Sequence, residues 1–359
     1  MNPSRRRLRA LVALLPTVLL AASLAQPAAV LAQAASAPAT LQAGLRMLTV
    51  PASASGAPAV PVALFYPTQA PDRSIAMGPF SLQVAVQAPP EATAKGLILL
   101  SHGTGGSELG HASLAQALAR AGYLVAALRH PGDDWQDRSL LKKDPARYFD
   151  ERPRQASRVI DALLADPAWG PRIRSDARGP RIGALGHSAG GYTVLALAGG
   201  LPELPRITAH CVAHRSEDPI FCGVGDDMPD MPPRSAAPAA PGAALRDPRV
   251  RAVVALAPMG VVFSAASLAA IPVPTAVYIA ALDRYLVPRF HGDWITSNLP
   301  AASRRPVANA WHFAFMDRPS MAIPSEDGDL RADPPGFDRT AFLQQLGQAL
   351  PLFFDQAWD

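Results

Sequence analysis

The residues best placed to do chemistry form the run Gly186-His187-Ser188-Ala189-Gly190. Residues 181–185 before it have the apolar composition of a buried strand, and the small residues at 190–198 after it favour a helix. A tight turn from strand to helix exposes the serine hydroxyl, and glycine two positions away on each side avoids collisions with neighbouring backbone. The pattern predicts Ser188 as a nucleophile and His187 as a packing residue.

A second glycine-rich run, SHGTGGS at residues 101–107, directly follows the apolar residues 97–100. Acyl transfer needs two backbone N–H groups aimed at the developing oxyanion, one from the residue after the nucleophile and one from such a loop. Ala189 and Thr104 are the predicted donors, and His102 is expected to support the loop. A phosphate-binding turn is the alternative, although no lysine follows the glycines as it does in a P-loop.

A serine nucleophile needs a histidine base and an orienting carboxylate, which here should follow it in the order acid, then histidine. Asp283 comes just after the apolar run 275–280, so we expect it at the carboxyl end of a strand. Asp293 is the rival, expected within or beside the next helix and facing solvent. His312, which is flanked by aromatic residues, is the predicted base.

The remaining histidines fit this chain order less well. His111 and His130 precede the nucleophile, and His291 is expected to start a helix. His210 and His214 have the i, i+4 spacing of zinc ligands on a helix, but the glutamate of a metalloprotease motif is missing and nearby prolines argue against a long helix. We expect no metal site and no cofactor.

The elements that must position these residues alternate along the chain. From residue 96 onward short apolar runs alternate with helical segments, which indicates a mostly parallel sheet with helices on both faces. Helices are predicted over residues 109–122, 153–165 with Pro153 in the first turn, 190–198 and 340–354. Eight strands are predicted, the first two as an edge hairpin, at residues 45–50, 60–66, 96–101, 123–128, 181–185, 250–256, 275–280 and 307–310.

Between residues 199 and 247 the alternation breaks into a stretch rich in proline, alanine and aspartate, too long for an ordinary connection. We interpret it as a loop-rich insertion over the active site, a lid, with a solvated surface loop as the alternative. It holds Cys211 and Cys222, the only two cysteines of the chain. In an exported protein this pair is expected to form a disulfide, with two free thiols as the alternative.

The start of the chain has the composition of a targeting segment. Four arginines lie among the first nine residues, and an apolar run and small residues around positions 32–34 follow. This predicts a cleaved signal peptide over 1–34, a flexible spacer over 35–40 and a catalytic domain over 41–359, in a periplasmic or secreted protein. An uncleaved anchor is the alternative, but the apolar run is shorter than the about 20 residues of a membrane span and contains Pro16. Sec and Tat export both remain open.

The overall composition, 49% apolar and 17% charged, is that of a folded globular protein. The net charge of +4 equals the charge of the four arginines of the predicted signal peptide, so the remaining chain is formally neutral. It has no basic stripe interleaved with aromatic residues, which excludes a nucleic-acid surface.

Four stretches together resemble the exported dienelactone-hydrolase-like group of the α/β-hydrolase superfamily, relatives of platelet-activating-factor acetylhydrolases and bacterial polyester hydrolases. They are Leu64-Phe65-Tyr66-Pro67, residues 99–106, residues 186–190, and Leu282-Asp283 with His312-Phe313. The resemblance implies the α/β-hydrolase fold and a serine hydrolase that forms an acyl-enzyme with a small-molecule or lipid-like ester.

Two departures refine this expectation. Dienelactone hydrolases have a cysteine nucleophile where this chain has Ser188, which favours ordinary carboxylic esters. The acetylhydrolases carry their acid after an earlier strand, where residues 256–259 hold no carboxylate, so the role returns to Asp283. A lipase, polyesterase or amidase of the same fold remains an alternative, as does a non-catalytic binding protein with this fold. The oligomeric state stays open.

Overall fold

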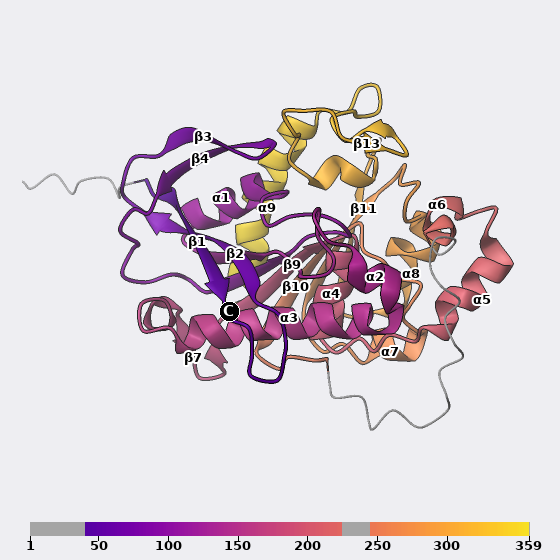
Figure 1. The fold of residues 1–359 in the computed structure, drawn as a ribbon, viewed down its shortest axis with the longest axis horizontal. Helices are drawn as coiled ribbons and strands as arrows, with labels where there is room; N and C mark the ends of the chain where they lie inside the picture. The colour runs from indigo at the N-terminus through magenta and orange to yellow at the C-terminus, as the bar shows by residue number, and fades with distance from the viewer. Residues whose placement is uncertain (1–39, 225–244, 359) are drawn as a thin grey trace, which may run out of the picture. The chain divides into compact units, whose positions relative to one another are not determined.

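The computed structural model describes residues 40–224 and 245–358. The predicted signal peptide and residues 35–39 of the predicted spacer lie outside this range. In the described part of the chain, ten strands form one mixed sheet in the order β12-β11-β10-β9-β5-β6-β2-β1-β4-β3 (Figure 1). They are β1 Gln42–Val50, β2 Val60–Thr68, β3 Arg73–Met77, β4 Phe80–Val86, β5 Leu97–Ser101, β6 Leu124–Leu128, β9 Ile182–His187, β10 Val250–Leu256, β11 Thr275–Ala280 and β12 Ala302–Val307.

Helices cover both faces of this sheet, as Figure 1 shows. They are α1 Ala112–Arg120, α2 Ser139–Lys143, α3 Pro145–Ala165, α4 Ala189–Leu197, α5 Pro205–His214, α6 Pro219–Gly223, α7 Ala265–Ala269, α8 Gly292–Asn298 and α9 Arg339–Trp358. Short 3₁₀ turns occur at Gly170–Arg172, Pro288–Phe290 and His312–Phe315, and two small hairpins pair β7 Ser175–Asp176 with β8 Gly179–Pro180 and β13 Pro324–Ser325 with β14 Gly328–Asp329. None of the described helices is long and apolar enough to cross a membrane.

The centre of the sheet is parallel and buried on both faces. The six strands from β6 to β12 in the sheet order pair in parallel, and β5, β6, β9 and β10 are buried at every position. On β5, Leu97 and Leu99 enter one apolar core with α3 and α4, whereas Ile98 and Leu100 enter the other with α1 and α9. The alternating side chains of the strand thus pack against helices on both faces of the sheet. Because the six strands are parallel, their carboxyl ends lie at one edge of the sheet.

The sheet has ten strands where eight were predicted, because the hairpin of β3 and β4 was missed. β4 alternates buried Phe80, Leu82 and Val84 with exposed Ser81 and Gln83, the period-two pattern of a strand with one wet face. The hairpin extends the sheet beyond β1, so the predicted pairing of the first two strands is confirmed but their edge position is wrong.

Two predicted element boundaries are also wrong. The last strand, expected at 307–310, occupies 302–307, an edge position where exposed Arg304 and Arg305 and a proline are tolerated and hide the strand signal. The helix expected to start at Pro153 starts eight residues earlier at Pro145, with Asp144 as its cap. Pro153 has no N–H for the carbonyl of Phe149, and the Tyr192 hydroxyl donates to that carbonyl at 2.7 Å instead.

The predicted insertion over residues 199–247 contains more helix than expected. Its prolines, which were expected to argue against a long helix around His210, stand at the first turns of the short helices α5 and α6, where a missing N–H costs nothing. The predicted disulfide is confirmed, since Cys211 and Cys222 join these two helices. Residues 225–244 of the insertion lie outside the described residues.

We expect the double change Cys211→Ala and Cys222→Ala to lower the free energy of unfolding by about 2 to 3 kcal/mol, because a crosslink between residues eleven apart restricts the unfolded chain. Thermal unfolding of the oxidised wild type and the double variant measures the loss. Reduction of the wild type should reproduce it, and reduction of the variant should change nothing. Equal midpoints for wild type and variant would contradict the expectation.

Asp317 caps the start of α1, where it accepts hydrogen bonds from the backbone N–H of Ser113, at 2.7 Å, and from the Ser113 hydroxyl. Burial raises the pKa of Asp317 to about 6. The fold therefore favours the protonated carboxyl, and this stabilisation is fully present below about pH 4 and is lost as the pH rises through 6.

This group alone should lower the free energy of unfolding by about 2 kcal/mol between about pH 4 and pH 6.5. Asp317→Asn should remove that part of the pH dependence. Urea unfolding of both proteins across this range measures the difference. Parallel curves for the two proteins would show that Asp317 does not titrate as expected.

Candidate active site

Ser188 occupies a sharp turn between β9 and α4. Its φ of +58° and ψ of −118° are strained for a residue with a side chain, a conformation that costs about 1 to 3 kcal/mol. A Cβ atom on Gly186 would lie 2.1 Å from the carbonyl oxygen of Gly190, and one on Gly190 would lie 2.0 Å from that of Ser101. Only glycine therefore fits at positions 186 and 190, two residues before and two residues after the serine.

The end of the neighbouring strand β10 holds this turn in place. The backbone N–H of Ser188 donates to the carbonyl of Leu256 at 2.9 Å, and the N–H of Met259 donates to the carbonyl of Ser188 at 3.2 Å. These bonds hold a half-buried serine at the carboxyl edge of the sheet, where a strained backbone is a common mark of a functional site.

Asp283 and His312 form a buried pair at the same edge. His312 Nδ1 donates to Asp283 Oδ2 at 2.7 Å, and the other carboxylate oxygen accepts the N–H groups of Tyr285 at 2.8 Å and Leu286 at 2.9 Å. Both side chains are nearly inaccessible, and the Tyr285 ring stacks on the imidazole. The aspartate fixes the tautomer that leaves Nε2 of His312 as an acceptor.

His187 connects this pair to the serine. Its Nε2 donates to the carbonyl of His312 at 3.0 Å, and the two rings lie 4.8 Å apart. Burial lowers the pKa of His187 well below its usual value, so the ring is neutral. His187 is thus the packing residue that was predicted, and it also fixes the loop of His312.

Among the described residues, no hydrogen bond joins His312 to Ser188. In enzymes such bonds are often long without substrate and shorten in the reactive complex. Ser188, Asp283 and His312 follow the parallel strands β9, β11 and β12, so the structure brings them to one edge of the sheet. It also orients the carboxylate of Asp283 toward His312.

The loop over residues 101–107 lies against the serine. A Cβ on Gly103 would lie 3.1 Å from Cβ of Ser188. Within the described chain, the N–H groups of Thr104 and Ala189 donate to no protein acceptor, whereas the N–H of Gly105 donates to Asp133 Oδ1 at 3.0 Å. The two predicted donors are therefore free to bind an oxygen atom.

Two buried histidines support this loop. His102 accepts the backbone N–H of His130 at 3.0 Å and donates to the carbonyl of Gly103 at 2.7 Å. His130 accepts the hydroxyl of Ser101 at 2.8 Å and donates to Gln155. Burial lowers the pKa of both histidines well below the usual value, so both act as neutral hydrogen-bonding groups.

The rival acid and two of the remaining histidines, His210 and His291, lie in other environments. Asp293 is on α8 and pairs with exposed Arg304 at 2.8 Å, as expected of a residue that faces solvent. His210 and His291 both bind Asp218 Oδ2 at 2.9 Å. In the described residues, no three or more histidine, cysteine, aspartate or glutamate side chains are arranged so that they could hold a metal ion.

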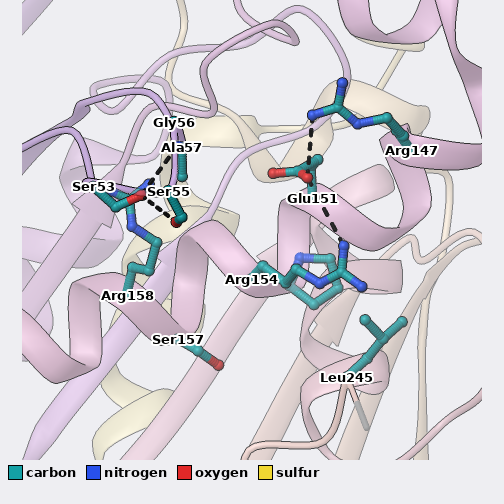
Figure 2. Close-up of a pocket in the computed structure, with 11 residues that line it drawn as sticks. Ser53, Ser55, Gly56, Ala57, Arg147, Glu151, Arg154, Ser157, Arg158 and Leu245 are labelled. Carbon is teal, nitrogen blue, oxygen red and sulfur yellow. Dashed lines mark hydrogen bonds and ion pairs between the residues drawn. The ribbon is translucent and has the colours of Figure 1, made fainter. Parts of the chain in front are cut away.

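A hollow of about 610 Å³ lies between the outer side of α3 and the turn at residues 53–57 (Figure 2). None of its lining residues belongs to the groups described above. Its arginines already have protein partners: Arg147 and Arg154 bind Glu151, and Arg158 donates to two backbone carbonyls. The hollow therefore adds nothing to the candidate site.

Sequence reasoning missed a buried ion pair of Arg152 and Asp133 beneath the glycine-rich loop. The available signal was a charged residue within the apolar stripe of α3, which runs through Phe149, Arg152, Ala156 and Val159. A charge on the buried side of a helix indicates a partner, but the sequence does not say which one.

Comparison with known proteins supports the fold. No family model matches the chain. Cutinase est1 and cutinase est2 from Thermobifida alba are each 32% identical over 116 residues, which is 32% of this chain, and the chain spans 34% of the length of these curated relatives.

Among solved structures, a ferulic acid esterase from Streptomyces cinnamoneus has a TM-score of 0.57 at 20% identity, over 89% of this chain and 91% of that one. A dienelactone hydrolase from Anabaena variabilis has a TM-score of 0.47 at 14% identity, over 88% and 98% of the two chains. The sheet order and the first of these structures show that the chain has the α/β-hydrolase fold that the sequence resemblance implied.

Proposed function

We propose that this protein is a serine hydrolase that cleaves carboxylic esters, with Ser188 as nucleophile, His312 as base and Asp283 as the orienting acid. The observation that carries the proposal is the buried hydrogen bond from His312 to Asp283 beside a serine held at a positive φ. A neutral imidazole with its Nδ1–H fixed on a carboxylate is the base that a serine hydroxyl requires.

The reaction follows from these positions. Ser188 Oγ attacks the acyl carbon while His312 Nε2 takes its proton, and Asp283 stabilises the resulting imidazolium. The oxyanion binds the N–H groups of Thr104 and Ala189, and the alcohol leaves with the proton from His312. Water then attacks the acyl-enzyme by the same steps and releases the acid. This chemistry uses no cofactor.

The substrate proposal is a small-molecule or lipid-like ester. The partial match to two cutinases supports ester cleavage, and the replacement of a cysteine nucleophile by Ser188 favours ordinary esters over dienelactone. We also propose export with cleavage after residue 34, and a lid role for the insertion over residues 199–247. N-terminal sequencing of the purified protein tests the cleavage.

Hydrolysis of p-nitrophenyl acetate, butyrate and decanoate, compared with the matching p-nitroanilides, tests the proposed reaction. We expect turnover of the esters, little turnover of the anilides, and covalent labelling of Ser188 by a fluorophosphonate. Preference for the anilides would indicate an amidase. Absence of both turnover and labelling would favour a non-catalytic binding protein of this fold.

A further inference from the structure

Arg152 is one of the two largest side chains that are fully buried in the described chain. It lies on the inner side of α3, and its partner Asp133, in the loop after β6, is equally inaccessible. Burying a guanidinium costs several kcal/mol unless each N–H donor finds an acceptor. The groups that accept hydrogen bonds from Arg152 therefore indicate its structural role.

The pair anchors the loop on both sides of Thr104. One guanidinium nitrogen of Arg152 donates to the carbonyl of His102 and, at 3.3 Å, to the hydroxyl of Ser101. Asp133 accepts the N–H of Gly105 at 3.0 Å. The peptide that carries the Thr104 N–H thus lies between two peptides that the ion pair holds.

The same guanidinium also reaches, through Thr193, the carbonyl of Ala189, whose N–H is the other predicted oxyanion donor. Arg152 Nε donates to the hydroxyl of Thr193 at 3.0 Å, and that hydroxyl donates to the carbonyl of Ala189 at 2.9 Å. A single side chain on α3 therefore connects the loop after β5 to the first turn of α4.

We propose that Arg152 is the positioning residue of the oxyanion hole, with its guanidinium setting the spacing between the Thr104 and Ala189 N–H groups. The inference rests on the proposed function and deepens it. Arg152 is fully buried and its donors are bound by protein groups, so it touches no substrate. Its effect comes from geometry, because misplacing such donors by about 1 Å costs about 100-fold in rate.

The test compares an ester with its thionoester, in which sulfur replaces the carbonyl oxygen. Oxyanion donors stabilise a developing O⁻ far better than a larger, weakly accepting S⁻, so an intact hole gives a high ratio of ester to thionoester kcat. In Arg152→Met and Arg152→Lys we expect the ester kcat to fall by about 100-fold, the thionoester kcat to fall much less, and KM to change little.

Arg251→Met is the matched control. Arg251 is also a buried arginine, bound to Asp176 through two 2.9 Å contacts, but it lies near the start of β10, at the opposite edge of the sheet. Its loss should destabilise the fold and leave the ratio of ester to thionoester unchanged.

Thr193→Val keeps the inference testable if the arginine variants do not fold. It removes only the hydroxyl that connects Arg152 to Ala189, and we expect it to lower the ratio about threefold to tenfold through loss of the two hydrogen bonds that make this connection. A folded Arg152 or Thr193 variant with both rates unchanged, or lowered equally, would overturn the inference while the esterase proposal stands. A wild type without esterase activity would overturn both.

Discussion

Ser188→Ala is expected to lower kcat for ester hydrolysis by about 10⁴-fold to 10⁶-fold and to leave the fold intact. The hydroxyl is the only atom removed, and the backbone of the turn is held by bonds that do not involve it, from Ser188 to Leu256 and from Met259 to Ser188. The residual rate reflects the oxyanion donors and substrate binding, which survive the change.

The measurement is the initial rate with p-nitrophenyl butyrate, together with intact mass after fluorophosphonate treatment. Wild type should gain one label and Ser188→Ala none. Ser74→Ala, at an exposed serine on β3, is the control and should behave as wild type. More than a tenth of the wild-type activity in the Ser188→Ala protein would assign the nucleophile to another residue.

The strand-to-helix turn at Ser188 could be predicted from sequence because its pattern lies within five consecutive residues. Gly186 is required by a contact inside the turn and Gly190 by the backbone of the neighbouring strand β5, and both requirements appear in the sequence as one glycine spacing around the serine. The position of Asp283 could be predicted in the same way, because it follows from the apolar pattern of β11. The disulfide could be predicted because Cys211 and Cys222 are the only two cysteines in the sequence.

What sequence reasoning missed depends on contacts between distant segments. The helix α3 continues through Pro153 because Tyr192, from another helix, satisfies the carbonyl that the proline leaves without a donor. Arg152 and Asp133 come from different elements, and no periodicity in either one points to the other. The bond from His187 to the carbonyl of His312 likewise exists only after the sheet has formed.

Asp283→Asn is expected to lower kcat by about 10⁴-fold, the effect of the same change in a serine protease triad. The N–H groups of Tyr285 and Leu286 donate to Asp283 Oδ1, and an asparagine oxygen can accept them unchanged. The asparagine amide nitrogen then faces His312 Nδ1 as a donor. His312 must present a lone pair there and carry its proton on Nε2, where it can no longer accept the proton of Ser188.

Asp293→Asn is the matched control, since it makes the same change at the other aspartate between β11 and β12. Asp293 pairs with Arg304 at the surface of α8, so its loss should leave kcat within about twofold of wild type. Initial rates of both variants with p-nitrophenyl butyrate, and their unfolding midpoints, decide the matter. A large loss of kcat in Asp293→Asn, with Asp283→Asn near wild type, would show that the acid is Asp293 on α8. Equal small losses of kcat in both variants would show that neither carboxylate takes part in the mechanism. We expect a large loss of kcat in Asp283→Asn alone, because of these two aspartates only Asp283 contacts the imidazole of His312.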